Sequence, residues 1–223
     1  MKRSTILTSV LLVALGAAVA TQLWAFPETA RQTKTACATC HTNPAGGAGL
    51  SAAGTAFKAD GKAPAAGTAK AAEYVGDAKC KMCHMKQHKA WSTTKHAKAW
   101  EGLAKGDPKK VADMAAALKV EIKGSADKTD GCVTCHVTGF QLAGGYPQAD
   151  AVKAAAVSNV TCESCHGPGS LHVAAPMAKK KEFISKPTEN MCKQCHTATT
   201  SPNFVFADYA KRGVHQVAAA AAK

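Results

Sequence analysis

The sequence predicts a mostly α-helical protein with much irregular loop. Alanine-rich segments without glycine or proline alternate with short segments rich in both, which is the pattern of short helices joined by turns. Hydrophobic residues make up 46% of the chain, yet aromatic residues make up only 5%, and alanine supplies much of the rest. Such a chain would not bury a conventional core. We therefore expect bulky groups other than side chains to fill the interior.

All ten cysteines lie in five copies of one motif, C-x-x-C-H. This is the attachment pattern of c-type haem, in which two cysteines bind the porphyrin and the histidine binds its iron. The sequence thus predicts five covalently bound haems c, with the chain wrapped around the stacked haems. The expected attachment residues are Cys37, Cys40, Cys80, Cys83, Cys132, Cys135, Cys162, Cys165, Cys192 and Cys195, and the proximal ligands are His41, His84, His136, His166 and His196.

Zinc sites and disulfides explain the same cysteines less well. A tetrahedral zinc site needs two cysteine pairs, so five pairs would leave one over, and zinc gives no reason for a histidine after every pair. A disulfide within each C-x-x-C would close only a very small loop and would constrain the chain little. Haem c is therefore the preferred interpretation.

The first residues have the pattern of an export signal. Lys2 and Arg3 precede an uncharged apolar run over 6–20, and small residues suit cleavage after residue 20 or 25. The run is short for a membrane span, which needs about 20 apolar residues. We predict a signal peptide over 1–25 and a mature protein with no stable membrane span, in the periplasm or outside the cell. An uncleaved N-terminal anchor is the alternative.

Lysine and arginine outnumber aspartate and glutamate by 28 to 15, so the net charge is +13. Such an excess is typical of proteins that bind nucleic acid or membrane surfaces. Five haems would bring ionised propionates, however, and many lysines would then be propionate partners. We therefore expect no nucleic-acid partner. The expected partners are redox proteins, either other cytochromes or a reductase or dehydrogenase, and the charge would attract an acidic one.

The motifs divide the mature chain into two haem-binding parts. We predict an N-terminal monohaem segment over 26–57, a linker rich in alanine, glycine, lysine and proline over 58–72, and a tetrahaem domain over 73–223. Within this domain helices are expected from His84 to Trp100, from an Asp107–Pro108 start to Leu118, over 148–157, over 176–184 and from Ser201 onward.

Four histidines remain after the proximal ones, namely His88, His96, His172 and His215. His96 is the favoured distal ligand in its segment, whereas His88 suits either an iron ligand or a solvated helix face. The Gly167–Pro168–Gly169 turn is too short to bring His172 across its own porphyrin, so we predict that His172 ligates a different haem.

Four distal histidines cannot serve five irons. The missing ligand would be a methionine, a lysine such as Lys62, a histidine from a neighbouring subunit, or nothing. A five-coordinate iron would bind a small molecule, whereas six-coordinate irons only pass electrons.

From Tyr74 to His215 the chain resembles the tetrahaem cytochrome c family that accepts electrons from hydroxylamine oxidoreductase. The resemblance is carried by YVGDAKCKMCH, GCVTCHVTGF, CESCHGPGSLH and CKQCHTATTSPNF, in that order. It implies close haem pairs, distal ligation by His96, His172 and His215, and a five-coordinate haem on Cys132 and Cys135. It does not extend to the additional N-terminal haem on Cys37 and Cys40.

These observations predict an exported five-haem electron-transfer cytochrome of an anaerobic or respiratory chain, without a catalytic residue. Two alternatives stay open. One is a redox enzyme for a small nitrogen oxide at an open iron, although no His, Tyr or Arg cluster stands beside a motif in the sequence. The other is a subunit of an extracellular cytochrome filament or another homo-oligomer, in which a second chain supplies the missing histidine.

Overall fold

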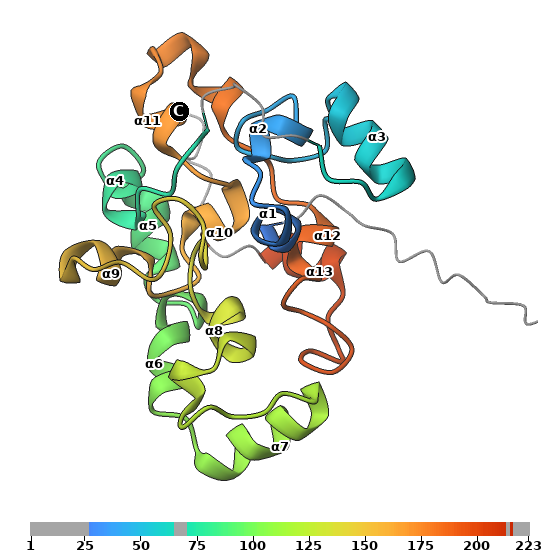
Figure 1. Ribbon diagram of the computed structural model, residues 1–223. Coiled ribbons are helices and arrows are strands. Elements are labelled where there is room, and N and C mark those ends of the chain that lie inside the picture. The colour runs from blue at the N-terminus through green and yellow to red at the C-terminus, as the bar shows by residue number, and fades with distance from the viewer. Residues whose placement is uncertain (1–26, 65–70, 213–214, 216–223) are drawn as a thin grey trace, which may run out of the picture.

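The computed structural model describes residues 27–64, 71–212 and 215, and the predicted signal peptide lies outside them (Figure 1). The described residues form short helices and loops with no β-strand, and the nearest approach to one is an isolated bridge between His41 and Leu50. The predicted fold class, mostly helical with much loop, is confirmed. No helix within these residues has the length and apolar character that crossing a membrane requires.

The α-helices are α1 Pro27–Thr33, α2 Cys37–Cys40, α3 Ala52–Asp60, α4 Asp77–Lys81, α5 Met85–Trp91, α6 Ala99–Ala104, α7 Pro108–Leu118, α8 Asp130–His136, α9 Ala151–Val157, α10 Cys162–His166, α11 Ser170–Ala174, α12 Glu189–Cys192 and α13 Phe206–Arg212. Three 3-10 helices accompany them, η1 His96–Lys98, η2 Ala126–Lys128 and η3 Met177–Phe183.

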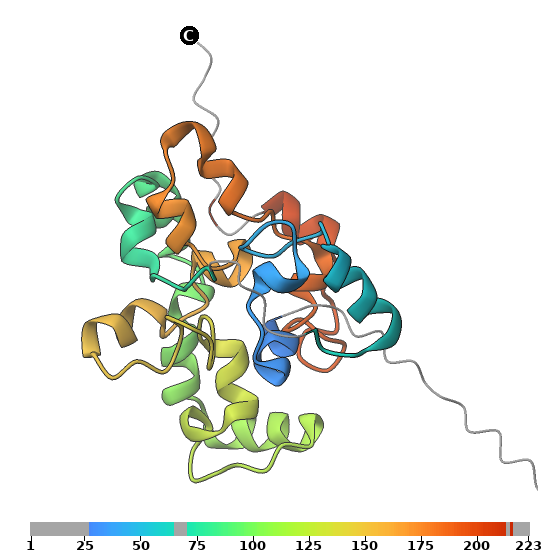
Figure 2. The same cartoon turned by 45° about the horizontal axis from the view of Figure 1, so that its top comes forward.

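Helix α10 lies near the centre of the molecule, with α4 and α5 on one side and α12 and α13 on the other (Figures 1 and 2). The pair α6 and α8 lies below α10 in Figure 1, and α1, α2 and α3 lie beside α12 and α13 in both views. The five haem motifs fall in or beside α2, α4, α8, α10 and α12. The fourth motif is therefore the central one, although it comes fourth in the sequence.

Side-chain caps fix several helix starts as the sequence predicts. Asp107 accepts a hydrogen bond from the backbone of Lys110 at 2.9 Å, Pro108 occupies the first helical turn, and α7 ends at Leu118. Asp150 caps α9 in the same way, so that helix begins at Ala151 and not at 148. Because such caps depend on residues three apart, they can be predicted from sequence.

Three predicted helices differ in the structure. The segment expected over 176–184 forms 3-10 helix η3, and the last described helix begins at Phe206, not at Ser201. The helix expected to reach Trp100 stops at Trp91. There the hydroxyls of Ser92, Thr93 and Thr94 donate to carbonyls three residues back, which competes with helix continuation.

The N-terminal segment packs on the rest of the chain. The Asn43 side chain donates to the carbonyl of Ile184 at 3.2 Å, and Ser185 donates to the carbonyl of Ala45 at 3.3 Å. Further along, the Arg31 guanidinium donates to the carbonyl of Phe140 at 3.4 Å. These contacts attach the first haem motif to the part of the chain that carries the third, fourth and fifth.

Candidate functional site

The ten cysteines all have free thiols. No three His, Cys, Asp or Glu side chains within the described residues are close enough to share a metal ion, so that part of the chain shows no zinc-type cluster. Each thiol belongs to a C-x-x-C-H motif, the type of motif whose cysteines bind haem in c-type cytochromes. The donor set therefore suits covalent haem attachment, with the histidine of each motif as the candidate iron ligand.

Hydrogen bonds to Nδ1 orient four of the five motif histidines. An imidazole whose Nδ1–H is bonded to a carbonyl has its tautomer fixed with Nε2 as the ligating nitrogen, as in metal sites generally. Nδ1 of His41 is 3.2 Å from the carbonyl of Gly49, and Nδ1 of His136 is 2.7 Å from the carbonyl of Ala99. Nδ1 of His166 is 2.9 Å from the carbonyl of Ser185, and Nδ1 of His196 is 2.8 Å from the hydroxyl of Ser201.

Three motif histidines each lie opposite one of the remaining histidines. The ring centroids are 6.2 Å apart for His84 and His172, 6.0 Å for His166 and His215, and 5.9 Å for His196 and His96. His172 also has its Nδ1 bonded to the carbonyl of Lys180 at 2.8 Å. In each pair the two residues come from different segments of the chain.

These separations match the span of two imidazoles across one metal ion. With about 2 Å from each nitrogen to the metal and about 1 Å from nitrogen to ring centre, the centroids of two axial imidazoles lie about 6 Å apart. The three pairs therefore fit bis-histidine ligation. In this arrangement His172 lies opposite His84 of the second motif and not opposite the histidine of its own motif.

The environment of these histidines favours the neutral form that binds metal. Burial lowers the pKa of His96, and the nearby His196 lowers it further. Burial also lowers the pKa values of His196 and His166. The charges of His215, His84 and His172 lower the pKa of His166 further. Because only a neutral imidazole can ligate a metal, these pKa values suit the proposed role.

His88 has a different partner. Its Nε2 is 2.8 Å from a carboxylate oxygen of Asp77, and its ring packs against Trp91 with centroids 5.2 Å apart. The nitrogen that an iron ligand would use is thus engaged in a hydrogen bond. In this structure His88 therefore does not lie opposite a motif histidine, whereas His96, His172 and His215 each do.

Contacts between thiols define which motifs are neighbours. A hydrogen bond between Cys80 and Cys162 raises the pKa of Cys80 and lowers that of Cys162, with burial opposing the second shift. A similar bond to Cys195 lowers the pKa of Cys135 to about 7. The second motif therefore touches the fourth, and the third touches the fifth.

The two close pairs are joined through the fourth and fifth motifs. Burial and, to a lesser extent, the neighbouring Cys192 and Cys162 raise the pKa of Cys165 to about 12. The four motifs thus form a row in the order second, fourth, fifth, third. This order differs from the order in the sequence, so it depends on the tertiary structure.

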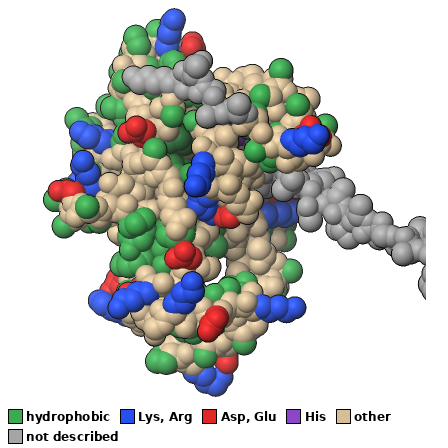
Figure 3. All heavy atoms as spheres, viewed as in Figure 1, with side chains coloured by type: hydrophobic (Ala, Val, Ile, Leu, Met, Phe, Trp, Pro, Cys, Tyr) green, Lys and Arg blue, Asp and Glu red, His purple; other side chains and the backbone are tan. Residues whose placement is uncertain are grey.

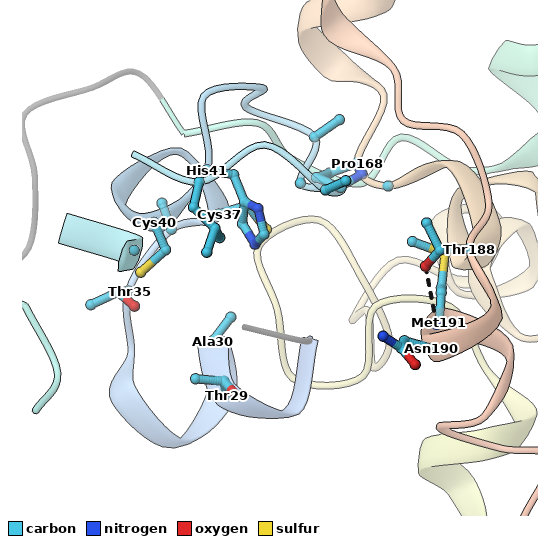
Figure 4. Close-up of a pocket in the computed structure, with 18 of the residues that line it drawn as sticks. Thr29, Ala30, Thr35, Cys37, Cys40, His41, Pro168, Thr188, Asn190 and Met191 are labelled. Atoms are coloured by element: carbon cyan, nitrogen blue, oxygen red, sulfur yellow. Dashed lines mark hydrogen bonds between the residues drawn. The ribbon is translucent and has the colours of Figure 1, made fainter. Parts of the chain in front are cut away.

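The first motif lines a cavity of about 250 Å³ (Figure 4). Cys37, Cys40 and His41 lie on one side of it, and Thr188, Asn190 and Met191 lie on the other. The remaining lining is largely apolar and includes Leu50, Phe57, Tyr74 and Pro168. The cavity adjoins the fourth and fifth motifs, since Ser164 and Gln194 also line it. An apolar cavity beside C-x-x-C-H suits a porphyrin.

Comparison with known proteins addresses the second to fourth motifs. Residues 79–167 match the family described as cytochrome c554 and c-prime. This range contains three complete motifs, which end at His84, His136 and His166. The chain is a multihaem c-type cytochrome.

The curated relative cytochrome c-554 of Nitrosomonas europaea is 41% identical over 127 residues, which cover 55% of this cytochrome and 52% of the relative. The chain thus spans about half the length of that relative. The solved reduced state of cytochrome c554 from Nitrosomonas europaea is 28% identical, with a TM-score of 0.42, over 56% of this chain and 65% of that one. The predicted resemblance to this family is confirmed over residues 79–167. Its extension to His215 and the number of haems stay predictions.

Two charged residues of this cytochrome were missed from sequence. Arg31 has only 12% of its side chain exposed, lies over the Phe140 ring and lowers the pKa of Cys135, although less than Cys195 does. Nothing in the sequence indicated that Arg31 stands near Cys135, because Arg31 arrives from a distant segment. Glu163 lies inside the fourth motif and is 2% exposed. The only feature of the sequence that pointed to Glu163 was its position between the two cysteines of the fourth motif.

Proposed function

We propose that this cytochrome is an exported five-haem electron carrier. The observations that support it are three histidine pairs at about 6 Å, two pairs of motifs in thiol contact, and the electrostatic proximity of the fourth and fifth motifs. Bound haem would supply one-electron redox chemistry at each position. The chain orients the candidate axial imidazoles and keeps the sulfurs of two pairs of motifs in contact. Hydrogen bonds from Nδ1 to carbonyls fix the tautomers of His41, His136, His166 and His172.

The fifth haem is proposed for the cavity at Cys37, Cys40 and His41. His41 is 8% exposed and Cys40 is 6% exposed, so the site is well shielded from water. Because Ser164 and Gln194 line the same cavity, a haem there would adjoin those of the fourth and fifth motifs. The first motif would then form a branch from the middle of the row and not an extension of its end.

The proposed partner is an acidic redox protein that docks at the second motif. Cys83 and His84 are exposed, so the second motif is the most solvent-exposed of the motifs. Two segments, 77–98 and 177–186, are brought together by the contact between His84 and His172. Together they hold ten lysines and two acidic residues, a net charge of +8, whereas the whole chain carries +13. Lysines lie over α4 and α5 at the left edge of the molecule (Figure 3). Such a patch steers an acidic partner to the end of the row.

The test begins with the protein matured in a host that attaches haem c. Intact mass and N-terminal sequencing should show five haems on a chain that begins after residue 20 or 25. Rapid mixing with a limiting amount of a one-electron reductant should then show electrons spreading over all haems in one fast phase. Four haems, or haems that reduce independently with no exchange between them, would contradict the proposal.

Reaction with a small molecule at the third motif is the second candidate function. His136 is held by the carbonyl of Ala99, and no other histidine in the described residues faces it. Electron paramagnetic resonance of the monomer should show a high-spin iron that binds nitric oxide if this iron is open. If every iron is low-spin and unreactive in the monomer, the enzyme alternative fails. A high-spin signal that disappears on self-association would favour the filament alternative.

A further inference from the structure

Glu163 is a buried carboxylate without a cationic partner among the described residues. It lies between Cys162 and Cys165 and is 2% exposed, and none of the ion pairs that join described residues includes it. Four backbone hydrogen bonds hold it instead. Val75 donates at 3.0 and 3.1 Å, Gly76 at 2.8 Å and Gly169 at 2.7 Å. Burying a carboxylate is costly unless it is hydrogen-bonded in this way.

This carboxylate lies at the contact between the second and fourth motifs. Gly76, one of its donors, accepts a hydrogen bond from the Cys80 thiol at 3.7 Å, and Glu163 itself follows Cys162 directly. The Cys80–Cys162 hydrogen bond is the main cause of the raised pKa of Cys80, and the charge of Glu163 adds to it. The field of the carboxylate therefore reaches the attachment cysteines of the second and fourth motifs, and Glu163 also lines the cavity beside the first motif.

A charge at such a position must change the relative stability of the two oxidation states of a nearby iron. Oxidation adds a positive charge to the iron. A nearby negative charge in a region from which water is excluded stabilises the oxidised iron strongly. The same carboxylate in water would be screened and would have little effect. Local charge and burial are among the factors by which proteins set haem potentials.

We propose that Glu163 is a fixed internal charge that lowers the reduction potentials of the haems on the second and fourth motifs and of the haem proposed for the cavity of the first, which Glu163 also lines. This inference rests on the proposed function, because it requires haems on Cys80, Cys83, Cys162 and Cys165. Glu163 acts through its charge and not by ligating iron. It would keep the second and fourth haems oxidised more readily than the fifth and third, and so it would favour electron flow along the row away from the lysine-rich end.

The test compares three variants of the full chain. E163Q removes the charge and keeps the shape, E163D keeps the charge and shortens the side chain, and E189Q is the matched control. Glu189 also precedes a motif cysteine, but it is about half exposed and paired with Lys193 at 2.7 Å. Intact mass confirms five haems, and spectroscopy confirms unchanged axial ligation, before redox titration of each variant.

In E163Q the second and fourth haems should favour the reduced state at least tenfold more than in the wild type, which is 59 mV for a one-electron couple. E163D should keep the low potentials even if its stability falls, and E189Q should match the wild type. Placing a cation beside Gly76 with Ala156→Lys should raise the same two potentials with Glu163 in place, which provides a test if E163Q does not incorporate haem.

Two results would overturn the inference while the proposed function stands. One is a five-haem E163Q protein with intact ligation and unshifted potentials. The other is an equal shift in E163Q and E163D, which would mean that packing and not charge is responsible. A wild-type protein without haem on Cys162 would instead overturn the proposed function, and this inference with it.

Discussion

The imidazoles of His84 and His172 lie 6.2 Å apart, with ring planes 27° from parallel. His84 closes the second motif, whereas His172 lies in α11, after the turn that follows the fourth motif. The segment from His166 to His172 thereby carries the histidine of the fourth motif and the histidine that faces the second motif. With haem bound, it would supply a proximal ligand to one iron and a distal ligand to its neighbour.

Replacing His172 with alanine should therefore affect the haem on Cys80 and Cys83 and not the haem on its own motif. We expect one iron to change from low-spin to high-spin, because its sixth ligand is lost while His84 remains. Electron paramagnetic resonance and the visible spectrum would detect the change. If His172→Ala leaves the spin state and potential of every haem unchanged, the predicted ligation is wrong.

Replacing His88 with alanine should leave every spin state unchanged, since its Nε2 is bonded to Asp77. We expect only a loss of stability, of about 1–3 kcal/mol, because the half-buried Asp77 carboxylate loses its hydrogen-bond partner. Thermal unfolding of the haem-loaded protein measures this loss. A new high-spin signal in this variant would show that His88 ligates iron in place of one of the other histidines.

Charge reversal at the lysine-rich end should slow electron exchange with an acidic partner. We expect Lys79→Glu, Lys81→Glu and Lys181→Glu together to lower the second-order rate with an acidic flavodoxin at least tenfold at low ionic strength. The matched control reverses three exposed lysines elsewhere, Lys110, Lys123 and Lys128. Stopped-flow mixing measures both rates. Equal slowing in the two triple variants would show that overall charge, and not this surface, determines the encounter.

The cap of α7 gives a prediction about stability alone. Asp107→Ala should lower the free energy of unfolding by about 0.5–2 kcal/mol, because the Lys110 amide loses its acceptor. Asp113 lies in the same helix and only pairs with Lys109 on the surface, so Asp113→Ala should cost less than about 1 kcal/mol. Chemical denaturation compares the two. A larger loss for Asp113→Ala would contradict this account.

Much of the local structure was predictable because its causes are close in sequence. The five motifs depend on spacings of three and one residues, and the start of α7 depends on Asp107 and Pro108. The end of helix α5 at Trp91, earlier than predicted, also has a local cause, because the hydroxyls of residues 92–94 donate to carbonyls three residues back. A contact with a distant segment contributes too, since the indole of Trp91 donates to the carbonyl of Val160 at 3.0 Å.

By itself the sequence determined five C-x-x-C-H motifs, four histidines outside them and a shortage of large apolar side chains. These are properties of composition and short spacing. Only the tertiary structure decided which histidine faces which motif, the order of the motifs in the row, and the burial of Glu163 and Arg31 beside them. Each of these depends on contacts between segments far apart in the chain, and many packings of the same short helices would satisfy the same local rules. What selects one packing is the summed hydrogen bonding and burial of those distant contacts.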